Sequence, residues 1–429
     1  MNSTQTQPAN SNIKPTLHGV KIKQRKGIQK AQAKHEPEVF RDSLLAQIAK
    51  AQPGDLEEIS SILDKAGNTM EYRKYGENIF EVLIIGGILQ PGGIVMDDVE
   101  RSPFSIVGGE DDAASIKKSV DVFNKLIRRY KYLQRPLEET LKNILLFINK
   151  WTPEENSKLA KATAYFITTQ LVPPTVLKVV SKDYLVKDGH SLDFVTTVFG
   201  TILKEQSVDQ LGKYLTAAGL ETSLLEFFPP NNRTDKALDE HFEAQGMKQL
   251  VEFHHRNQKD SVKKDLLLGL KQMLRLDEEE QSTAEVLTFI KENVKQGDLT
   301  EADTIPIVWN AVLDTVDLIN TRPDQVESYI MRALKRWNEL LEAYTHSPKS
   351  EVVLLQRVQI NCYEDAKLTK IFSRIVQLLY KNDVLSDNAI LYWADKAHKP
   401  QGKTVLMKQI EPFVNWLREN EDDSDEDDE

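Results

Sequence analysis

Apolar residues recur along most of this chain at steps of three and four positions. Two long stripes of this kind are Ile116, Val120, Phe123, Ile127 and Tyr130, and Leu137, Leu141, Ile144 and Ile148. The spacing returns in Leu287, Ile290 and Val294, and in Trp309, Val312 and Val316. It places these side chains on one face of a helix, which must then pack against another helix. The pattern predicts a chain built from amphipathic helices.

The sequence shows no strict alternation of apolar and polar residues joined by Gly-Asn or Asp-Gly turns, so we expect no substantial sheet. Helical segments of roughly 12–18 residues are separated by short polar breaks, which is typical of stacked helical hairpins. The predicted fold class is therefore all-α, a two-domain HEAT-type solenoid of helical hairpins. No exact repeat motif accompanies it, and the prediction depends on the type and length of the elements.

Breaks in the pattern suggest a domain map. Residues 227–232 combine two prolines with turn-forming residues, and a residue before proline disfavours helix. Residues 90–112 are expected to form a long loop inside the first domain. Asp55, and Asp387 or Asn388, are expected helix N-caps. The expected parts are a disordered basic tail (1–35), an N-terminal HEAT-like domain (36–230), a C-terminal HEAT-type domain (231–418) and a disordered acidic tail (419–429).

Composition agrees with folded helices. Of the 429 residues, 40% are hydrophobic and 28% are charged. The first residues lack the apolar core of a signal peptide, and no apolar run is long enough to span a bilayer, so we expect a cytoplasmic protein with no membrane partner. The single cysteine, Cys362, allows no internal disulfide and no cysteine-cluster zinc site. Its apolar neighbours predict a buried, inert thiol.

Charge is concentrated at the two ends of the chain. Residues 1–35 carry seven Lys or Arg and no acidic residue, whereas residues 419–429 carry nine acidic residues and no basic one. Blocks of like charge commonly serve as interaction tails. The basic end suits nucleic acid or an acidic surface, and the acidic end should attract a basic segment.

The search for catalytic chemistry yields nothing that defines an enzyme. The glycines of residues 86–93 fit neither a dinucleotide-binding nor a phosphate-loop pattern, and a helix end followed by a turn explains them better. His254 and His255 are adjacent, whereas paired metal ligands on a helix are four residues apart, so we expect solvated or capping histidines. We therefore expect no catalytic residue, no metal and no cofactor.

Two C-terminal segments combine aromatic residues with acidic ones: residues 383–395 interleave them, and residues 413–418 run directly into the acidic tail. One interpretation is that both tryptophans belong to the core of the last hairpin. The other is that the rings border a surface ringed by carboxylates, where lysine stems would lie on aromatic faces. The two are compatible. The candidate partner-binding residues are Asp383, Asp387, Tyr392, Trp393, Asp395, Phe413, Trp416, Glu419, Glu421, Asp422, Asp423, Asp425 and Glu426.

A second hypothesis is RNA binding through basic residues. The candidates for contact with RNA or an acidic partner are Lys21, Lys23, Arg25, Lys26, Lys125, Arg128, Arg129 and Lys131. Tyr130 and Tyr132 interleave with the second group, which suits stacking on single strands. Tyr130 also belongs to an apolar stripe, and core packing explains it better. RNA binding is therefore the secondary interpretation.

The two C-terminal segments resemble the aromatic–acidic boxes of the W-two domain, the HEAT-type C-terminal domain of initiation factor 5 and of the epsilon subunit of initiation factor 2B. Residues 14–17 (KPTL), 71–76 (EYRKYG), the glycines of 86–93 and residues 122–133 (VFNKLIRRYKYL) resemble the initiation-factor-5-mimic family, also called basic leucine zipper and W-two domain proteins. The likeness extends over essentially the whole chain in the expected order. It implies that residues 36–230 form a domain like the middle domain of initiation factor 4G and that residues 231–418 form a W-two domain. No seven-residue ladder continues from the leucines at 266–274, so the residues do not support a zipper.

The resemblance implies a regulator of translation initiation. Proteins of that family bind initiation factor 2, through lysine-rich boxes of its beta subunit, and initiation factor 3. They compete with factor 5 and restrain initiation at poor or non-AUG start codons, which extends the expected partners to the preinitiation complex on the small ribosomal subunit. An activator like factor 5 carries a four-cysteine zinc ribbon, which a single cysteine cannot build.

Overall fold

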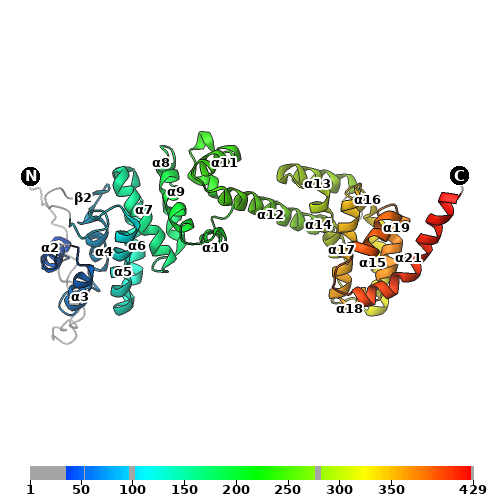
Figure 1. Ribbon diagram of the computed structural model, residues 1–429, viewed down its shortest axis with the longest axis horizontal. Coiled ribbons are helices and arrows are strands. Elements are labelled where there is room, and N and C mark those ends of the chain that lie inside the picture. Colours follow the sequence, from blue (N-terminus) through cyan, green and yellow to red (C-terminus); the bar gives the residue numbers. More distant parts are fainter. Residues whose placement is uncertain (1–34, 53, 96–101, 276–281, 427–429) are drawn as a thin grey trace, which may run out of the picture. The chain divides into compact units, whose positions relative to one another are not determined.

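The computed structural model describes residues 35–52, 54–95, 102–275 and 282–426, with side chains described up to Asn420 in the last helix. The chain divides into two compact units (Figure 1). Unit 1 runs to Leu220 and adds Glu226–Arg233, and unit 2 consists of Glu221–Leu225 and the residues from Thr234 onward. Within the described residues the chain is almost entirely helical, which confirms the predicted all-α class.

Unit 1 contains nine α-helices in its described part. Their bounds are α2 (Pro37–Ile48), α3 (Leu56–Ala66), α4 (Gly76–Ile85), α5 (Ala113–Arg129), α6 (Gln134–Leu145), α7 (Pro153–Thr168), α8 (Asp183–Val186), α9 (His190–Leu203) and α10 (Val208–Ala218). Shorter 3₁₀ segments are η1 (Lys131–Leu133), η2 (Ile148–Lys150), η3 (Pro174–Ser181), η4 (Leu224–Phe227) and η5 (Pro230–Asn232).

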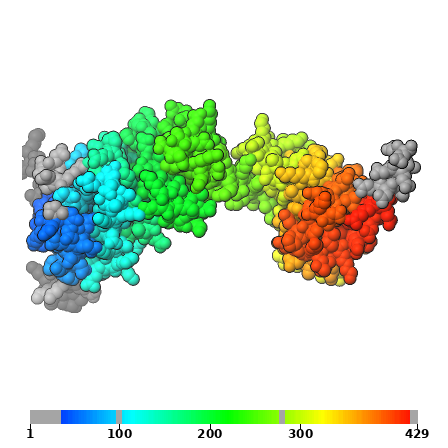
Figure 2. All heavy atoms as spheres, viewed as in Figure 1, coloured from blue at the N-terminus to red at the C-terminus, as the bar shows by residue number. Residues whose placement is uncertain are grey.

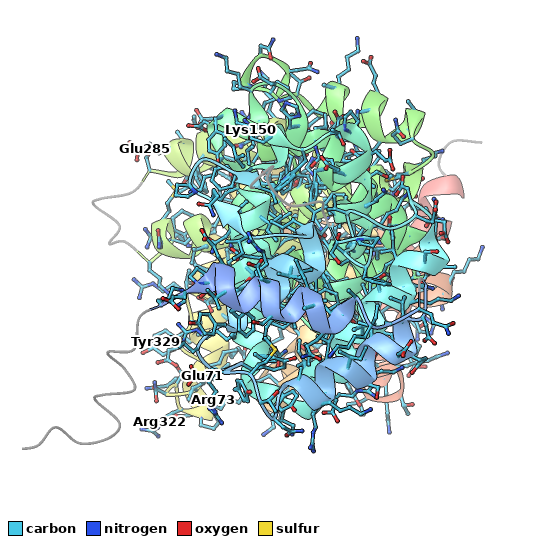
Figure 3. All side chains as sticks on the ribbon, turned by 90° about the vertical axis from the view of Figure 1, so that its left-hand side faces the viewer. Glu71, Arg73, Lys150, Glu285, Arg322 and Tyr329 are labelled. Carbon is cyan, nitrogen blue, oxygen red and sulfur yellow. The ribbon has the colours of Figure 1, made fainter. Side chains whose placement is uncertain are left out.

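The helices of unit 1 stack in two rows. One row runs α2, α4, α6 and η3, and the other runs α3, α5, α7 and α9. Each helix thus packs against the next-but-one helix in the sequence, which is the arrangement of a HEAT-type solenoid. Between the rows lies an aromatic core in which the Phe123 ring centroid is 5.7 Å from that of Phe80 and 5.0 Å from that of Phe166. Figure 3 views this unit from its first helices, with Glu71 and Arg73 marking the α3–α4 connection.

The stripe predicted for α5 is confirmed, because Ile116, Val120, Phe123 and Ile127 are all buried. Tyr130 follows the helix, and its hydroxyl donates to the Asp64 carbonyl at 2.9 Å. Helix starts are capped as expected at Asp55, whose carboxylate accepts from the Glu58 amide. Side-chain oxygens that satisfy free amides at a helix N-terminus fix where the helix begins.

The segment between α4 and α5 is irregular, as predicted. Gly86 ends α4 in the left-handed region (φ 77°), where a glycine is favoured. A small antiparallel pair follows, β1 (Leu89–Gln90) and β2 (Ile94–Val95). Further along, the Ile106 and Val107 amides donate to the last turns of α4, so the described part of this loop is held against the unit's core. The glycines of this segment thus mark a helix end and a turn.

Unit 2 carries the C-terminal helices. Their bounds are α11 (Asp235–Ala244), α12 (Lys248–Met273), α13 (Thr283–Gly297), α14 (Glu301–Leu313), α15 (Pro323–Arg336), α16 (Asn338–Glu342), α17 (Pro348–Glu364), α18 (Ala366–Thr369), α19 (Phe372–Lys381), α20 (Asp387–Tyr392), the π-helical turn η6 (Trp393–Ala397) and α21 (Lys403–Glu426). α12, α14, α17 and α20 pack in succession, and α15, α19 and α21 pack beside them. This unit also has one continuous apolar core, which includes Trp309, Trp337 and Trp393.

Two side chains of unit 2 were singled out by the sequence for their chemistry. Cys362 is buried, as predicted, and burial raises the pKa of its thiol to about 12, which keeps it protonated and unreactive. His254 is also fully buried, so the expectation of a solvated or capping side chain is wrong for this residue. It packs on α11, with its Nε2 3.4 Å from Asp235, and His255 Nε2 lies 2.8 Å from Asp239.

No helix in the described part of the chain combines the length and apolar character needed to cross a membrane.

Candidate partner-binding surface

Side chains of α17 hold the first aromatic–acidic segment, residues 383–395, in place. Glu351 is buried on this helix, and its carboxylate accepts from both the amide (2.5 Å) and the hydroxyl (2.8 Å) of Ser386. Ser386 in turn caps α20 by accepting from the Ala389 amide. The prediction that Asp387 or Asn388 is the N-cap is therefore wrong. The preceding serine takes that place, and the side chains of Asp387 and Asn388 remain exposed.

Gln359, also buried on α17, holds the turn that follows α20. Its amide nitrogen donates to the carbonyls of Lys399 and Gln401, both at 2.7 Å. Its oxygen accepts from the Trp393 indole at 3.3 Å and from the Lys399 amide at 2.9 Å. One side chain thus joins the π-helical turn η6 to the connection that leads into α21. A buried polar group with every hydrogen bond satisfied fixes a unique local geometry.

Trp393 is the first of the two predicted tryptophans, and its side chain has no exposed surface. It packs against Phe372 with ring centroids 5.8 Å apart. A tryptophan has a single polar donor, and here that donor is satisfied inside the protein by Gln359. Its expected place at a partner-binding surface is therefore wrong, and Trp393 acts as a core residue that anchors η6.

Trp416 lies on α21 and is 48% exposed. Its ring stacks on Phe413 with centroids 5.8 Å apart and planes 14° apart, and the Tyr380 ring meets both edge-on at 5.6 and 6.4 Å. We call Tyr380, Phe413 and Trp416 the aromatic cluster. It forms where α19 packs against α21 (Figure 2, orange and red). Tyr380 was missed in the sequence because it precedes the first segment by three residues and ends a different helix.

Four of the predicted carboxylates, those of Asp383, Asp387, Asp395 and Glu419, are exposed on the C-terminal elements of unit 2. Asp383, at the end of α19, is exposed and held in the left-handed region (φ 57°). Asp395 on η6 pairs with Arg418 of α21 at 2.6 Å, which ties the two segments together. Glu419 is exposed, and Tyr392 on α20 is 54% exposed. Glu421, Asp422, Asp423, Asp425 and Glu426 continue α21, and their side chains lie outside the described residues.

The basic candidates have a different environment. Lys125 pairs with Glu57 at 2.5 Å and with Asp121 at 3.1 Å, and these partners raise the pKa of its ammonium. Arg129 pairs with Asp64 at 3.1 Å. The contacts with Glu57 and Asp64 tie α5 to α3. Two of the four basic candidates that the structure describes are thus paired, while Arg128 and Lys131 are exposed. Lys21, Lys23, Arg25 and Lys26 lie outside the described residues.

The fold and this surface together define a class of protein, a two-unit HEAT-type helical protein whose last helix carries the aromatic cluster and continues into an acidic sequence. Comparison with known proteins agrees. The family described as 5MP1/2 HEAT domain matches residues 22–264, and the W2 family of eIF4-gamma, eIF5 and eIF2-epsilon matches residues 350–427.

Curated relatives match the chain over nearly its whole length. Protein krasavietz of Drosophila melanogaster is 36% identical over 418 residues, covering 97% of each chain. The eIF5-mimic protein 1 of Rattus norvegicus is 35% identical and that of Homo sapiens 34%, each covering 97% of this chain and 98% of the relative. The chain belongs to the eIF5-mimic protein family, whose members resemble translation initiation factors.

Proposed function

We propose that this protein regulates translation initiation by occupying sites that initiation factor 5 would otherwise use. In this proposal it binds lysine-rich boxes in the beta subunit of initiation factor 2, and it binds initiation factor 3. By competing with factor 5 in the cytoplasm it restrains initiation at poor or non-AUG start codons. The role is that of a binding protein, with no catalytic step of its own.

The observation that carries this proposal is the exposed ring of Trp416, held by the partly buried Phe413 and Tyr380, just before the acidic end of the sequence. Lysine side chains combine an aliphatic stem with a charged tip, so they suit a surface that offers rings and carboxylates together. The stem packs on the face of Trp416, which is 48% exposed, and the ammonium reaches the carboxylates of Glu419 and the residues after it. Factor 5 itself is among the W2 proteins, which supports competition for the same partner.

The expected affinity comes from many weak contacts. An exposed ion pair contributes about 0.2–1 kcal/mol, so several carboxylates must act together with the rings. Such a surface prefers a flexible, lysine-rich segment over a rigid partner, because each lysine can find its own carboxylate.

A pull-down of initiation factors from cytosol tests the proposal. The variant should end at Arg418, because Val414 and Leu417 are buried and a shorter chain would lose core contacts. We expect the full chain to retain factors 2 and 3, and the chain without residues 419–429 to lose most of factor 2. Added factor 5 should displace factor 2 from the full chain. Full retention of factor 2 by the truncated chain would exclude the acidic surface as its binding site.

A further inference from the structure

We propose that unit 1 binds single-stranded RNA on a surface made of Arg73, Arg128, Lys131, Tyr132 and Arg135, which we call the arginine–tyrosine surface. The inference does not depend on the proposed function, because it concerns other residues, the other unit and a ligand of opposite charge. It gives the protein a second binding activity beside the capture of lysine-rich segments.

Packing inside unit 1 brings the two parts of this surface together. Arg73 (labelled in Figure 3) lies in the connection between α3 and α4, and the other four residues lie where α5 ends and α6 begins. The two segments pack closely at Gly76, where a Cβ atom would lie 3.0 Å from the Pro136 ring and 3.3 Å from the Leu133 side chain. The Arg73 guanidinium lies over the Tyr132 ring, 4.2 Å from its centroid.

A row of tyrosines supports this stacked pair from the core outward. Tyr72 is buried, and its ring centroid is 5.6 Å from that of Tyr130, which in turn is 6.0 Å from that of Tyr132. The hydroxyls of Tyr72 and Tyr130 donate to the carbonyls of Leu63 and Asp64 on α3, each at 2.9 Å. Tyr132 is the half-buried outer end of the row. The core thus sets the position of the ring that Arg73 covers.

Positive charge is in excess around the stacked pair. Residues 67–76 and 128–135 together contain six basic residues and one acidic residue, Glu71. Within the part of the chain that the structure describes, four of these cations are exposed and have no carboxylate partner, namely Arg73, Arg128, Lys131 and Arg135. The surface therefore favours an anionic ligand.

The cations flank the tyrosine ring on both sides in the sequence. Arg128 lies in the last turn of α5, and η1 runs directly into α6. Residues three or four positions apart on a helical turn are neighbours, so Lys131 and Arg135 share a side of this turn, and Arg135 also adjoins Tyr132. A chain of phosphates passing over the ring would meet a cation before and after it.

Single-stranded RNA is the anion that uses both features. Its unpaired bases stack on aromatic rings and on guanidinium planes, while its phosphates pair with arginine and lysine. The exposed guanidinium of Arg73, backed by Tyr132, offers a base such a plane. An acidic peptide would use the charges but not the stacked pair, and the bases of a duplex remain stacked on one another.

Three of the cations can be removed without touching the core. The neutral variant carries Arg128→Gln, Lys131→Gln and Arg135→Gln in the full chain. The control carries Lys178→Gln, Lys182→Gln and Lys187→Gln, which removes the same charge from exposed positions on η3 and around α8. The probe is a fluorescein-labelled, unstructured RNA of about twelve nucleotides, and its affinity is read by fluorescence polarisation at several salt concentrations.

We expect the neutral variant to bind this RNA at least about tenfold more weakly than the wild type. Its slope of log affinity against log salt should be shallower by about two, because each phosphate contact contributes about 0.7 to that slope. The control should match the wild type in both quantities. Equal affinity for the wild type and the neutral variant, equal losses in both variants, or no RNA binding by the wild type would each overturn the proposal.

Tyr132 tests the stacking component. Tyr132→Phe keeps the ring and should bind RNA like the wild type, whereas Tyr132→Ala should bind at least about fivefold more weakly with an unchanged salt slope. Thermal unfolding of each variant checks that the unit remains folded. Equal affinity for the two variants would contradict the stacking.

Two further measurements identify the ligand and the place where it binds. Photo-cross-linking with an RNA that contains thiouridine should give links within residues 128–135, and links confined to other segments would contradict the proposal. An oligoglutamate of the same net charge should displace the RNA only weakly. Displacement as effective as that by unlabelled RNA would assign the surface to an acidic protein segment and overturn the proposal.

Discussion

Two tryptophans that look alike in the sequence have opposite roles at the residue scale. Trp393 is fully buried and hydrogen-bonded to Gln359, whereas Trp416 is half exposed beside Phe413. Both lie in a segment that combines aromatic residues with nearby acidic ones. What separates them is the neighbour each one meets in the fold, a buried glutamine of α17 for the first and solvent for the second.

Replacing each tryptophan by alanine should therefore have different effects. Trp416→Ala should weaken oligolysine binding by about 1 kcal/mol, or roughly fivefold, because the ring offers lysine stems an exposed face. The stability of this variant should fall by only about 0.5–1.5 kcal/mol, through the lost contacts with Phe413 and Tyr380. Trp393→Ala should cost about 3–5 kcal/mol of stability, because it leaves a large cavity. Tyr363, which is 57% exposed on α17, serves as an aromatic control, and Tyr363→Ala should change neither quantity.

His254 predicts a pH dependence of stability. Burial lowers the pKa of this imidazole, although Asp235 opposes the effect, so the folded state keeps it neutral where the unfolded state takes up a proton. The free energy of unfolding should then fall as the pH drops below about 6.5, by at most about 1.4 kcal/mol per pH unit for this group. Urea unfolding at a series of pH values should show that the free energy of unfolding falls less at low pH in His254→Gln than in the wild type.

At the scale of elements, α17 is the scaffold of the binding surface. On this helix, Glu351 accepts a hydrogen bond from the Ser386 amide, and Gln356 donates one to the Ala397 carbonyl. Gln359 donates to the Lys399 carbonyl in the η6–α21 connection. The residues that make the surface thus depend on polar groups buried beneath them.

Gln359→Leu should be among the most damaging single substitutions in unit 2. It removes the hydrogen bonds to Trp393, Lys399 and Gln401, and buried groups left unpaired cost about 1–3 kcal/mol each. We expect a stability loss of about 3–5 kcal/mol, measured by urea unfolding, together with weaker oligolysine binding. Gln356→Ala, which removes one hydrogen bond, should lose only about 1 kcal/mol. Equal losses would show that Gln359 is not the central support.

The two partners of the Asp395–Arg418 ion pair should have opposite effects on oligolysine affinity when each is replaced. The two side chains are about half exposed and 2.6 Å apart, so removing either should change stability by less than about 1 kcal/mol. Arg418→Gln removes a positive charge from the acidic helix end and should tighten oligolysine binding, whereas Asp395→Asn should weaken it. Each change should be at most about fivefold at low salt. Changes in the same direction would mean that the pair matters for geometry and not for charge.

For the whole molecule, the sequence predicted the helical class, the family and the positions of the two C-terminal segments, because these depend on periodicity and on local motifs. The stripe of α5, the burial of Cys362 and the cap at Asp55 followed from neighbouring residues alone.

The remaining features depend on contacts between distant residues. Tyr380 joins Phe413 only because α19 packs on α21, and Trp393 is buried only because Gln359 reaches it from 34 positions away. Ser386 likewise caps α20 where a distant residue holds it, because its hydroxyl donates a hydrogen bond to Glu351 of α17. Periodicity shows which face of a helix is apolar, but it does not show which partner covers that face.

The central claim is that the aromatic and acidic end of α21 binds a lysine-rich segment of initiation factor 2. The most direct measurement is a titration of a lysine-box peptide from its beta subunit against the full chain at rising salt, beside a variant with the acidic residues of 419–429 changed to Asn and Gln. We predict affinity that falls at least about tenfold between low salt and about 0.5 M, where screening is strong, and very weak binding to the neutral variant. Affinity that is the same at both salt concentrations, or the same for both chains, would contradict the claim.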